Sequence, residues 1–238
     1  MSSVELIAHR GTPRERRENT LPAFARAIDH GADGIELDVH FTADGVPVVH
    51  HDATLGASAG AYAGVSLATL TAAAIRVASD DPALAPPPLR DVAALVAGRA
   101  TLYVEVKAAA SDANLRALLG AVAPTTGADR VSAAVHAFDH RTALRVSTLA
   151  PRVPTGILSE SYLVDTPAAL RAARARDLWQ HWSQLDAALV DAVHAAGGRI
   201  IAWTVNDADH ARTLARLGVD GLCTDDVPLV RAALAMPT

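Results

Sequence analysis

The chain has 238 residues, of which 50% are hydrophobic and 20% are charged, and its formal net charge is -5 at pH 7. These values suit one large α/β domain or two small ones, and they exclude a disordered chain and a basic nucleic-acid-binding face. A single cysteine excludes an internal disulfide framework, and no run reaches the roughly 18 apolar residues of a membrane span. The N-terminus has no signal-peptide pattern, so we expect a cytoplasmic protein without a stable membrane anchor. The oligomeric state is not readable from these features.

Short β-rich runs alternate along the chain with segments of helical period. This alternation predicts a parallel sheet whose strands are joined by helices. The start-to-start spacings are 21 to 30 residues, apart from a second spacing of 67, and fit eight strand–helix units. No G-x-G-x-x-G follows the first strand, so we expect a TIM (β/α)8 barrel over residues 1–238 rather than an open Rossmann sheet. The expected strands are Val4–Ala8, Gly34–Val39, Thr101–Val106, Val131–His136, Val153–Leu158, Leu178–Trp182, Arg199–Thr204 and Gly221–Cys223.

The long second spacing holds two additional features. The turn Thr42–Gly45 is too short for a parallel crossover, so Val46–His51 is expected to fold back as an antiparallel β-hairpin on the second strand. Residues 53–88 are rich in Ala, Gly and Ser and end in three prolines. We expect this segment to form a short inserted lid over the barrel mouth rather than a separate domain.

Charged side chains lie near the C-terminal ends of the first three barrel strands, which is where barrel enzymes carry their catalytic groups. Because side chains alternate along a strand, residues two positions apart share one face. The hairpin returns His50 and His51 to the same end of the barrel. The candidate residues on the three strands are His9, Arg10, Glu36, Asp38, Glu105 and Lys107.

Three acidic side chains in one pocket repel one another unless a cation neutralises them, and carboxylate oxygens suit a divalent ion such as Mg²⁺ or Ca²⁺. Arg10 and Lys107 suit an anionic substrate, the first as a planar fork and the second as a point charge. Lys107 is the only lysine beside 20 arginines. A metal, two cations and two imidazoles together are suited to the hydrolysis of a phosphodiester.

Seven short motifs that contain these residues follow one another from Ile7 to Pro228. With them, the chain resembles the glycerophosphodiester phosphodiesterase family, which is related to phosphatidylinositol-specific phospholipase C. The motifs are H-R-G (9–11), E-N-T (18–20), G-A-D-G-I-E-L-D-V (31–39), T-x-D-G-x-x-V-V-x-H-D (42–52), Y-V-E-V-K (103–107), W-T-V-N (203–206) and G-V-D-G-x-x-T-D (218–225).

The resemblance implies a metal-dependent hydrolysis of small glycerophosphodiesters, such as glycerophosphocholine, to an alcohol and sn-glycerol 3-phosphate. It carries over His51 rather than His50, because His51 directly precedes Asp52. The residues that it implies are Glu36, Asp38 and Glu105 for the metal, His9 and His51 for acid/base catalysis, Arg10 and Lys107 for the phosphate, and Trp203 as an apolar wall near the alcohol.

Two departures from the family pattern concern the alcohol pocket. The stretch after Asp52 lacks the usual R-T-T-like sequence, and Ala137-Phe138 replaces the usual S-F pair. These changes leave the metal and acid/base positions intact and leave the identity of the alcohol open.

Structural roles compete with several of these assignments. Glu36 and Asp38 could pair with arginines, and Glu105 could pair with Lys107 alone. His136 and His181 could either line the pocket or serve the fold, whereas Trp179 suits packing. Helix capping is the favoured role for Asn206, Asp207, Thr224 and Asp225.

Three other functions compete with a glycerophosphodiesterase. A lysophospholipase D would cleave a lipid diester, although the chain has no basic amphipathic helix for membrane docking. A non-catalytic barrel would only bind a phosphorylated ligand, but such proteins are expected to lack one acid or one imidazole. An aldolase-type barrel would use Lys107 as a Schiff base, which requires an apolar or cationic setting rather than neighbouring carboxylates.

Overall fold

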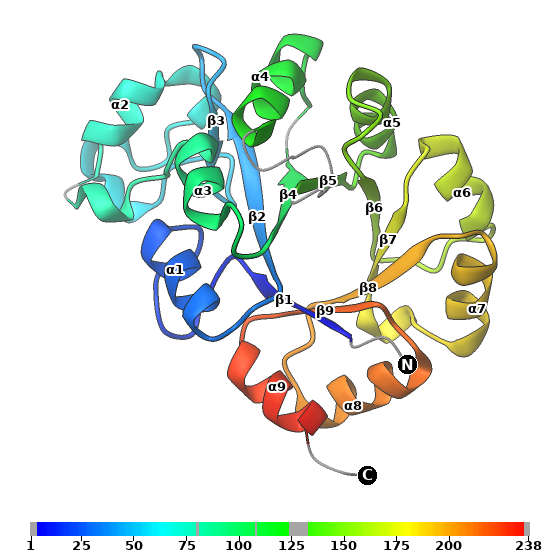
Figure 1. Ribbon diagram of the computed structural model, residues 1–238. Coiled ribbons are helices and arrows are strands. Elements are labelled where there is room, and N and C mark those ends of the chain that lie inside the picture. Colours follow the sequence, from blue (N-terminus) through cyan, green and yellow to red (C-terminus); the bar gives the residue numbers. More distant parts are fainter. Residues whose placement is uncertain (1–3, 80, 108, 124–132, 236–238) are drawn as a thin grey trace.

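The computed structural model describes residues 4–79, 81–107, 109–123 and 133–235. Eight parallel strands form a ring in the order β1-β9-β8-β7-β6-β5-β4-β2, and pairing of β1 with β2 closes it (Figure 1). The predicted TIM barrel is therefore confirmed. The ring strands are β1 Glu5–His9, β2 Gly34–Phe41, β4 Thr101–Val106, β5 Ala133–Ala137, β6 Thr155–Ser159, β7 Asp177–His181, β8 Arg199–Trp203 and β9 Gly221–Thr224.

Each predicted strand corresponds to one observed ring strand, and the boundaries differ by at most two residues where both can be compared. The first two residues of the expected strand Val131–His136 lie outside the described residues. The second strand is longer than expected and ends at Phe41, because its last residues pair with the hairpin.

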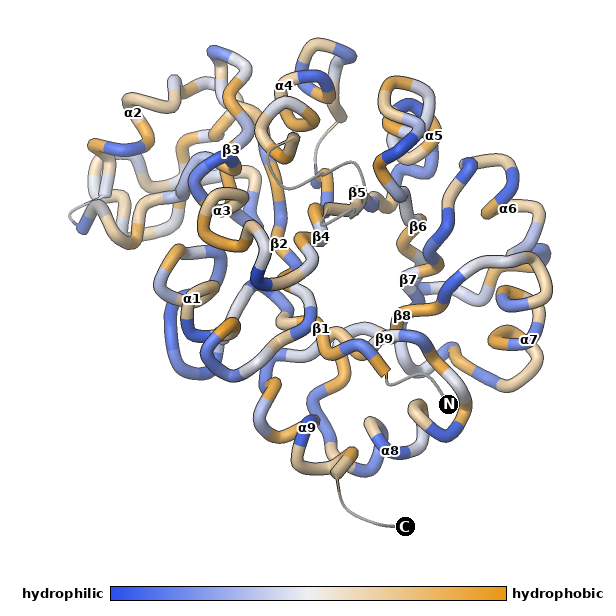
Figure 2. The backbone as a smooth tube through the Cα atoms, in the orientation of Figure 1, coloured by the Kyte–Doolittle hydropathy of each residue, from blue (hydrophilic) through white to orange (hydrophobic). Residues whose placement is uncertain are grey.

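An outer ring of helices covers the barrel, as Figure 1 shows. In Figure 2 these helices alternate between hydrophobic and hydrophilic stretches, because one face of each packs on the strands. No helix in the described part of the chain is long and apolar enough to cross a membrane. The helices are α1 Leu21–Asp29, α2 Ala72–Val77, α3 Leu89–Val96, α4 Asp112–Val122, α5 His140–Leu149, α6 Thr166–Ala173, α7 Ala187–Ala195, α8 Ala208–Leu217 and α9 Val227–Ala235.

The predicted hairpin is confirmed. Strand β3, Pro47–Val49, pairs antiparallel with the end of β2 and lies outside the ring (Figure 1). The segment 53–88 contains α2 and the short 3₁₀ helices η1 Ala57–Tyr62, η2 Leu67–Thr69 and η3 Pro82–Leu84. A fourth 3₁₀ turn, η5 Trp182–Gln184, follows β7.

The inserted segment lies at the side of the barrel. Its apolar residues form a small cluster with Val48 of β3, which includes Leu55, Leu67 and Ile75. Figure 1 shows α2 beyond β3, outside the strand ring. None of the described residues of 53–88 lines the pocket at the barrel mouth, so the structure shows a lateral insertion where the sequence suggested a lid.

The barrel interior follows a two-residue repeat along every strand. Ile7, Leu158, Trp179 and Ile201 belong to one buried interior cluster, whereas their chain neighbours pack outward against the helices. Strand register places these inward residues on one face around the whole ring. The repeat therefore determines which residue of each strand reaches the mouth.

Two large rings fill the interior, and glycines on neighbouring strands make room for them. A Cβ at Gly34 would lie 2.8 Å from the Tyr103 ring, and one at Gly156 would lie 2.9 Å from the Trp179 ring. At the N-terminal end of the barrel, the Tyr103 hydroxyl donates to the carboxylate of Glu5 at 2.8 Å. This end is closed by packing and ion pairs, which leaves the opposite end for a site.

Candidate active site

The inward residues at the C-terminal ends of the strands surround a pocket of about 230 Å³. A larger groove of about 1030 Å³ lies between α1, α2 and α3, but its charged lining residues are Arg76, Arg90 and Asp91, without a histidine. The smaller pocket gathers the titratable groups and is the candidate active site. Its lining residues are His9, Arg10, Glu36, His51, Glu105, Lys107, His136, Phe138, Leu158, Glu160, Trp179, Trp203 and Cys223.

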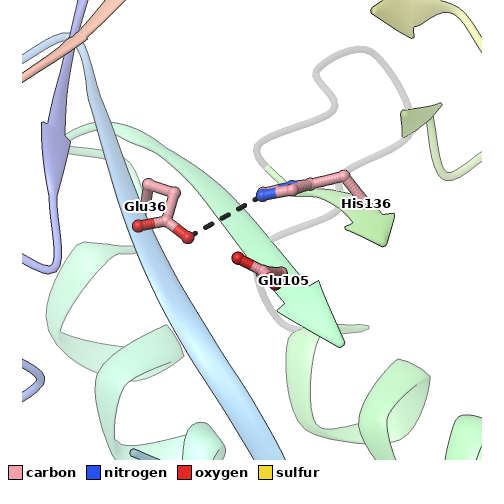
Figure 3. A group of neighbouring side chains, drawn as sticks. All are labelled: Glu36, Glu105 and His136. Atoms are coloured by element: carbon pink, nitrogen blue, oxygen red, sulfur yellow. Dashed lines mark ion pairs between the residues drawn. The ribbon is translucent and has the colours of Figure 1, made fainter. Parts of the chain in front are cut away.

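Two buried carboxylates, Glu36 and Glu105, face His136 at the bottom of this pocket (Figure 3). Each of the three residues offers one ligand atom within 4.8 Å of the others, so the group could hold a divalent metal ion. The Nε2 atom of His136 lies 3.7 Å from Oε1 of Glu36. The other nitrogen of this ring, Nδ1, is buried and has no hydrogen-bond partner among the described residues.

Burial and mutual repulsion make these carboxylates hard to ionise. Desolvation, followed by the charge of Asp38, raises the pKa of Glu36 to about 7. Burial and the charge of Glu36 also raise the pKa of Glu105. Burial lowers the pKa of His136 to about 4, so this imidazole is neutral at pH 7. A cation bound here would favour the ionised carboxylates.

Asp38 lies beside this group and is almost fully buried, with 1% of its surface exposed. Its Oδ2 atom accepts a hydrogen bond from the amide of Asn19 at 2.9 Å and lies 3.0 Å from Nε of Arg10. Its Oδ1 atom has no hydrogen-bond partner among the described residues, and Nζ of Lys107 lies 3.6 Å away. This oxygen of Asp38 therefore has room for a further cation beside the ammonium group of Lys107.

The two cations of the pocket are held by acidic residues. Lys107 lies 3.1 Å from Glu105, and Arg10 pairs with Asp38 and, through Nη1 at 3.2 Å, with Glu18. Of the structural pairings considered from the sequence, Asp38 with an arginine and Glu105 with Lys107 are present, although Lys107 also pairs with Asp38. Glu36 lies beside His136 instead of an arginine side chain. Both cations lie at the pocket wall. Lys107 has the carboxylates of Asp38 and Glu105 as neighbours rather than the apolar or cationic setting that a Schiff-base lysine requires.

His9 is oriented by a residue from the far end of the chain. Its Nδ1 atom donates to Oδ1 of Asp225 at 2.6 Å, and Asp225 in turn accepts from the Asn206 amide at 2.5 Å. Burial opposes charge on His9, but the hydrogen bond with Asp225 and the negative charges of Glu36 and Asp225 outweigh it, so its pKa is raised. Bonding at Nδ1 leaves Nε2 of His9 for proton exchange in the pocket.

His51 reaches the pocket from the hairpin, as its position after β3 predicted. Its Nδ1 atom donates to Asp52 at 2.8 Å, and its backbone carbonyl accepts from Nε2 of His40 at 3.0 Å. His50 is turned away from the pocket lining, and its Nε2 lies 3.3 Å from the carbonyl of Thr54. The structural role expected for His50 is consistent with this contact.

Asp225 and His136 were not assigned to the candidate site from the sequence, and the structure places both there. Asp225 was expected to cap a helix, but Asp226 accepts from the amide of Leu229 at 2.9 Å in the first turn of α9, and Asp225 bonds His9 instead. His136 was left between two roles, and it lies in the pocket. The inward repeat Cys223, Asp225 offered a signal for the first residue. The expected cap at Asp207 is confirmed by its bonds to Asp209 and His210.

Comparison of the whole chain with known proteins identifies the protein family. Residues 9–229 match the model of the glycerophosphoryl diester phosphodiesterase family. The chain belongs to this family. The family consists of phosphoric diester hydrolases, and the match covers seven ring strands in full and the last residue of β1.

Individual relatives of this phosphodiesterase agree with the family match. A glycerophosphodiester phosphodiesterase of Caldanaerobacter subterraneus subsp. tengcongensis is 30% identical over an alignment 229 positions long, and the alignment covers 93% of each chain. The crystal structure of a glycerophosphodiester phosphodiesterase from Thermotoga maritima superposes with a TM-score of 0.80 at 24% identity, covering 98% of this chain and 99% of the other. A phosphodiesterase of Oleispira antarctica, solved in complex with the product sn-glycerol-3-phosphate, gives 0.86 at 22% identity and covers 98% and 97%. These two superpositions show a shared fold.

Proposed function

We propose that this chain cleaves small glycerophosphodiesters, such as glycerophosphocholine, to an alcohol and sn-glycerol 3-phosphate in a metal-dependent reaction. The observation that carries the proposal is the juxtaposition of three buried carboxylates, two cations and two oriented histidines at one barrel mouth. The product bound to the Oleispira antarctica phosphodiesterase supports the same substrate class.

The proposed metal ligands are Glu36, Asp38 and Glu105, and the proposed ion is Mg²⁺ or Ca²⁺. The Oδ1 atom of Asp38, which has no hydrogen-bond partner among the described residues, and the raised pKa values of the two glutamates fit such an ion. His136 competes with Asp38 for the third position, since it lies within 4.8 Å of both glutamates. These residues would hold a divalent ion, which when bound would supply positive charge to offset the negative charge on the phosphoryl oxygens.

The remaining groups suit the other needs of the reaction. Arg10 and Lys107 bind the phosphate by charge-assisted hydrogen bonds. His9 accepts a proton from the attacking nucleophile, and His51 donates one to the leaving alcohol oxygen. Asp225 holds the His9 ring so that Nε2 faces the substrate, and Asp52 does the same for His51.

Release of sn-glycerol 3-phosphate from glycerophosphocholine tests the proposal. Chelation with EDTA should abolish release, and addition of Mg²⁺ or Ca²⁺ should restore it. Glu36→Gln and His51→Ala should each lower kcat by about a hundredfold or more, whereas His50→Ala, a matched control on the neighbouring residue, should retain activity. A chelator-resistant activity, or a fully active Glu36→Gln enzyme, would contradict the metal assignment.

Two further comparisons separate the remaining alternatives. Calorimetric titration with Mg²⁺ should show weaker binding to Asp38→Asn than to His136→Gln if Asp38 is the third ligand. Hydrolysis of lysophosphatidylcholine in place of glycerophosphocholine would identify a lysophospholipase D. Binding of phosphorylated ligands without hydrolysis of either diester would identify a non-catalytic barrel.

A further inference from the structure

The mouth of the barrel has two chemically different halves. Strands β1, β2 and β4 contribute the carboxylates, cations and His9, whereas β5 to β8 contribute most of the aromatic lining. Strand β6 is four positions from β1 in the ring of eight, so its end lies across the mouth from Arg10. A diester whose phosphate contacts the charged half therefore extends one substituent toward β5–β8.

Two aromatic rings form the wall of this second half. The rings of Phe138 and Trp203 lie 5.7 Å apart at 82°, an edge-to-face contact between residues that follow β5 and end β8. His181 packs edge-on against Trp203 at 5.5 Å and supports the indole. Phe138 remains 44% exposed, so an aromatic face is left uncovered beside the pocket. The Phe138 ring offers no hydrogen bond to the hydroxyls of a glycerol moiety, and the π faces of both rings attract cations.

A carboxylate accompanies these rings. Glu160 follows β6 two positions after the inward residue Leu158, so it lies on the same face and lines the pocket. It forms no hydrogen bond or ion pair with any residue that the structure describes. The other acidic residues at the pocket wall, Glu36 and Glu105, lie beside His136 or Lys107. Glu160 is therefore a negative charge available to a ligand.

We propose that Phe138, Trp203 and Glu160 form the subsite for the alcohol moiety and select an alcohol that carries an ammonium group over a neutral polyol. The inference rests on the proposed function and identifies Glu160 as a specificity-determining residue. A quaternary or primary ammonium satisfies the free carboxylate and contacts the aromatic faces at once. A neutral alcohol would leave the carboxylate unpaired, and an anionic alcohol would be repelled by it.

Substrate preference tests this subsite. We would measure kcat/KM for glycerophosphocholine, glycerophosphoethanolamine and the neutral diester glycerophosphoglycerol with the wild-type enzyme and three variants. Glu160→Gln should lower kcat/KM about fivefold for both cationic diesters and change the neutral one less than about twofold. Glu160→Lys should lower the cationic diesters further. Phe138→Leu, which keeps apolar volume but removes the ring, should reduce the choline diester more than the neutral one.

Asp191→Asn is the matched control, because Asp191 is an exposed carboxylate on the outer helix α7 and its loss removes the same charge. It should leave all three rates and their ratios unchanged. Unchanged ratios in both Glu160 variants, with active wild-type enzyme, would overturn the subsite and leave the proposed function standing. Failure of the wild-type enzyme to hydrolyse any of the three diesters would overturn both.

Discussion

Replacement of Glu36 by glutamine should stabilise the metal-free protein at neutral and alkaline pH while it removes a proposed metal ligand. Glu36 is 3% exposed, and its pKa is raised from the ordinary 4.5 to about 7 by burial and by Asp38. The folded protein therefore holds this proton up to about pH 7, whereas the unfolded chain releases it near 4.5. Stability is lost as the pH rises through this interval, because only the unfolded chain gains from ionisation.

The size of the effect follows from the same two values. The difference between 4.5 and about 7, at about 1.4 kcal/mol per pH unit, corresponds to about 3 kcal/mol at pH 8. At pH 5 the same linkage leaves less than about 1 kcal/mol. Glutamine has nearly the same shape as glutamate and cannot ionise, so Glu36→Gln should relieve this cost without leaving a cavity.

Urea unfolding in EDTA at pH 5 and pH 8 measures both quantities. We expect Glu36→Gln to be more stable than wild type by about 3 kcal/mol at pH 8, with the gain reduced to less than about 1 kcal/mol at pH 5. Glu160→Gln, which removes an exposed carboxylate at the same mouth, should change the free energy of unfolding by less than about 0.5 kcal/mol at either pH. Saturating Mg²⁺ should raise the Tm of wild type but not of Glu36→Gln. A Glu36→Gln protein that is no more stable than wild type at pH 8, or whose gain is the same at both pH values, would refute the reasoning.

Two further predictions concern orientation and packing. Asp225→Asn should lower kcat about a hundredfold. Because it removes a negative charge from the partner of His9, it should also move the NMR titration of the His9 ring to lower pH. A titration that does not move would show that Asp225 does not hold His9. Gly156→Ala should destabilise the protein by about 1–3 kcal/mol, because the new Cβ would lie 2.9 Å from the Trp179 ring. The control is Gly120→Ala in helix α4, where the new Cβ would have no other atom within 4 Å. This substitution should stabilise the protein by up to about 1 kcal/mol, because alanine favours the helix over glycine. Equal effects of the two alanines in urea unfolding would contradict the packing argument.

The sequence was sufficient for the barrel and for much of the site because both depend on local patterns. Alternation of strands and helices predicts the parallel ring, and a turn too short for a crossover predicts the hairpin. Within a strand, residues two positions apart share a face whatever the rest of the fold does. Glu36 with Asp38, and Glu105 with Lys107, could therefore be paired from their spacing alone.

The insertion could not be placed in this way. Residues 53–88 lack a clear period, and their position depends on which apolar surface is left uncovered by the rest of the chain. The hairpin offers such a surface through Val48, so Leu55, Leu67 and Ile75 pack there, beside the barrel rather than over its mouth. Burial of apolar area, not chain direction, determined where this segment lies.

The sequence by itself determined which residues of each strand point inward, because that property needs no partner. Ring closure decided which of them meet. It brings Asp225 to within 2.6 Å of His9, although 216 positions separate the two residues in the chain. It also places His136 near Glu36, and it places Glu160 across the mouth from Arg10. Such contacts depend on strand order and register around the barrel, and these are set by the packing of all eight strands together.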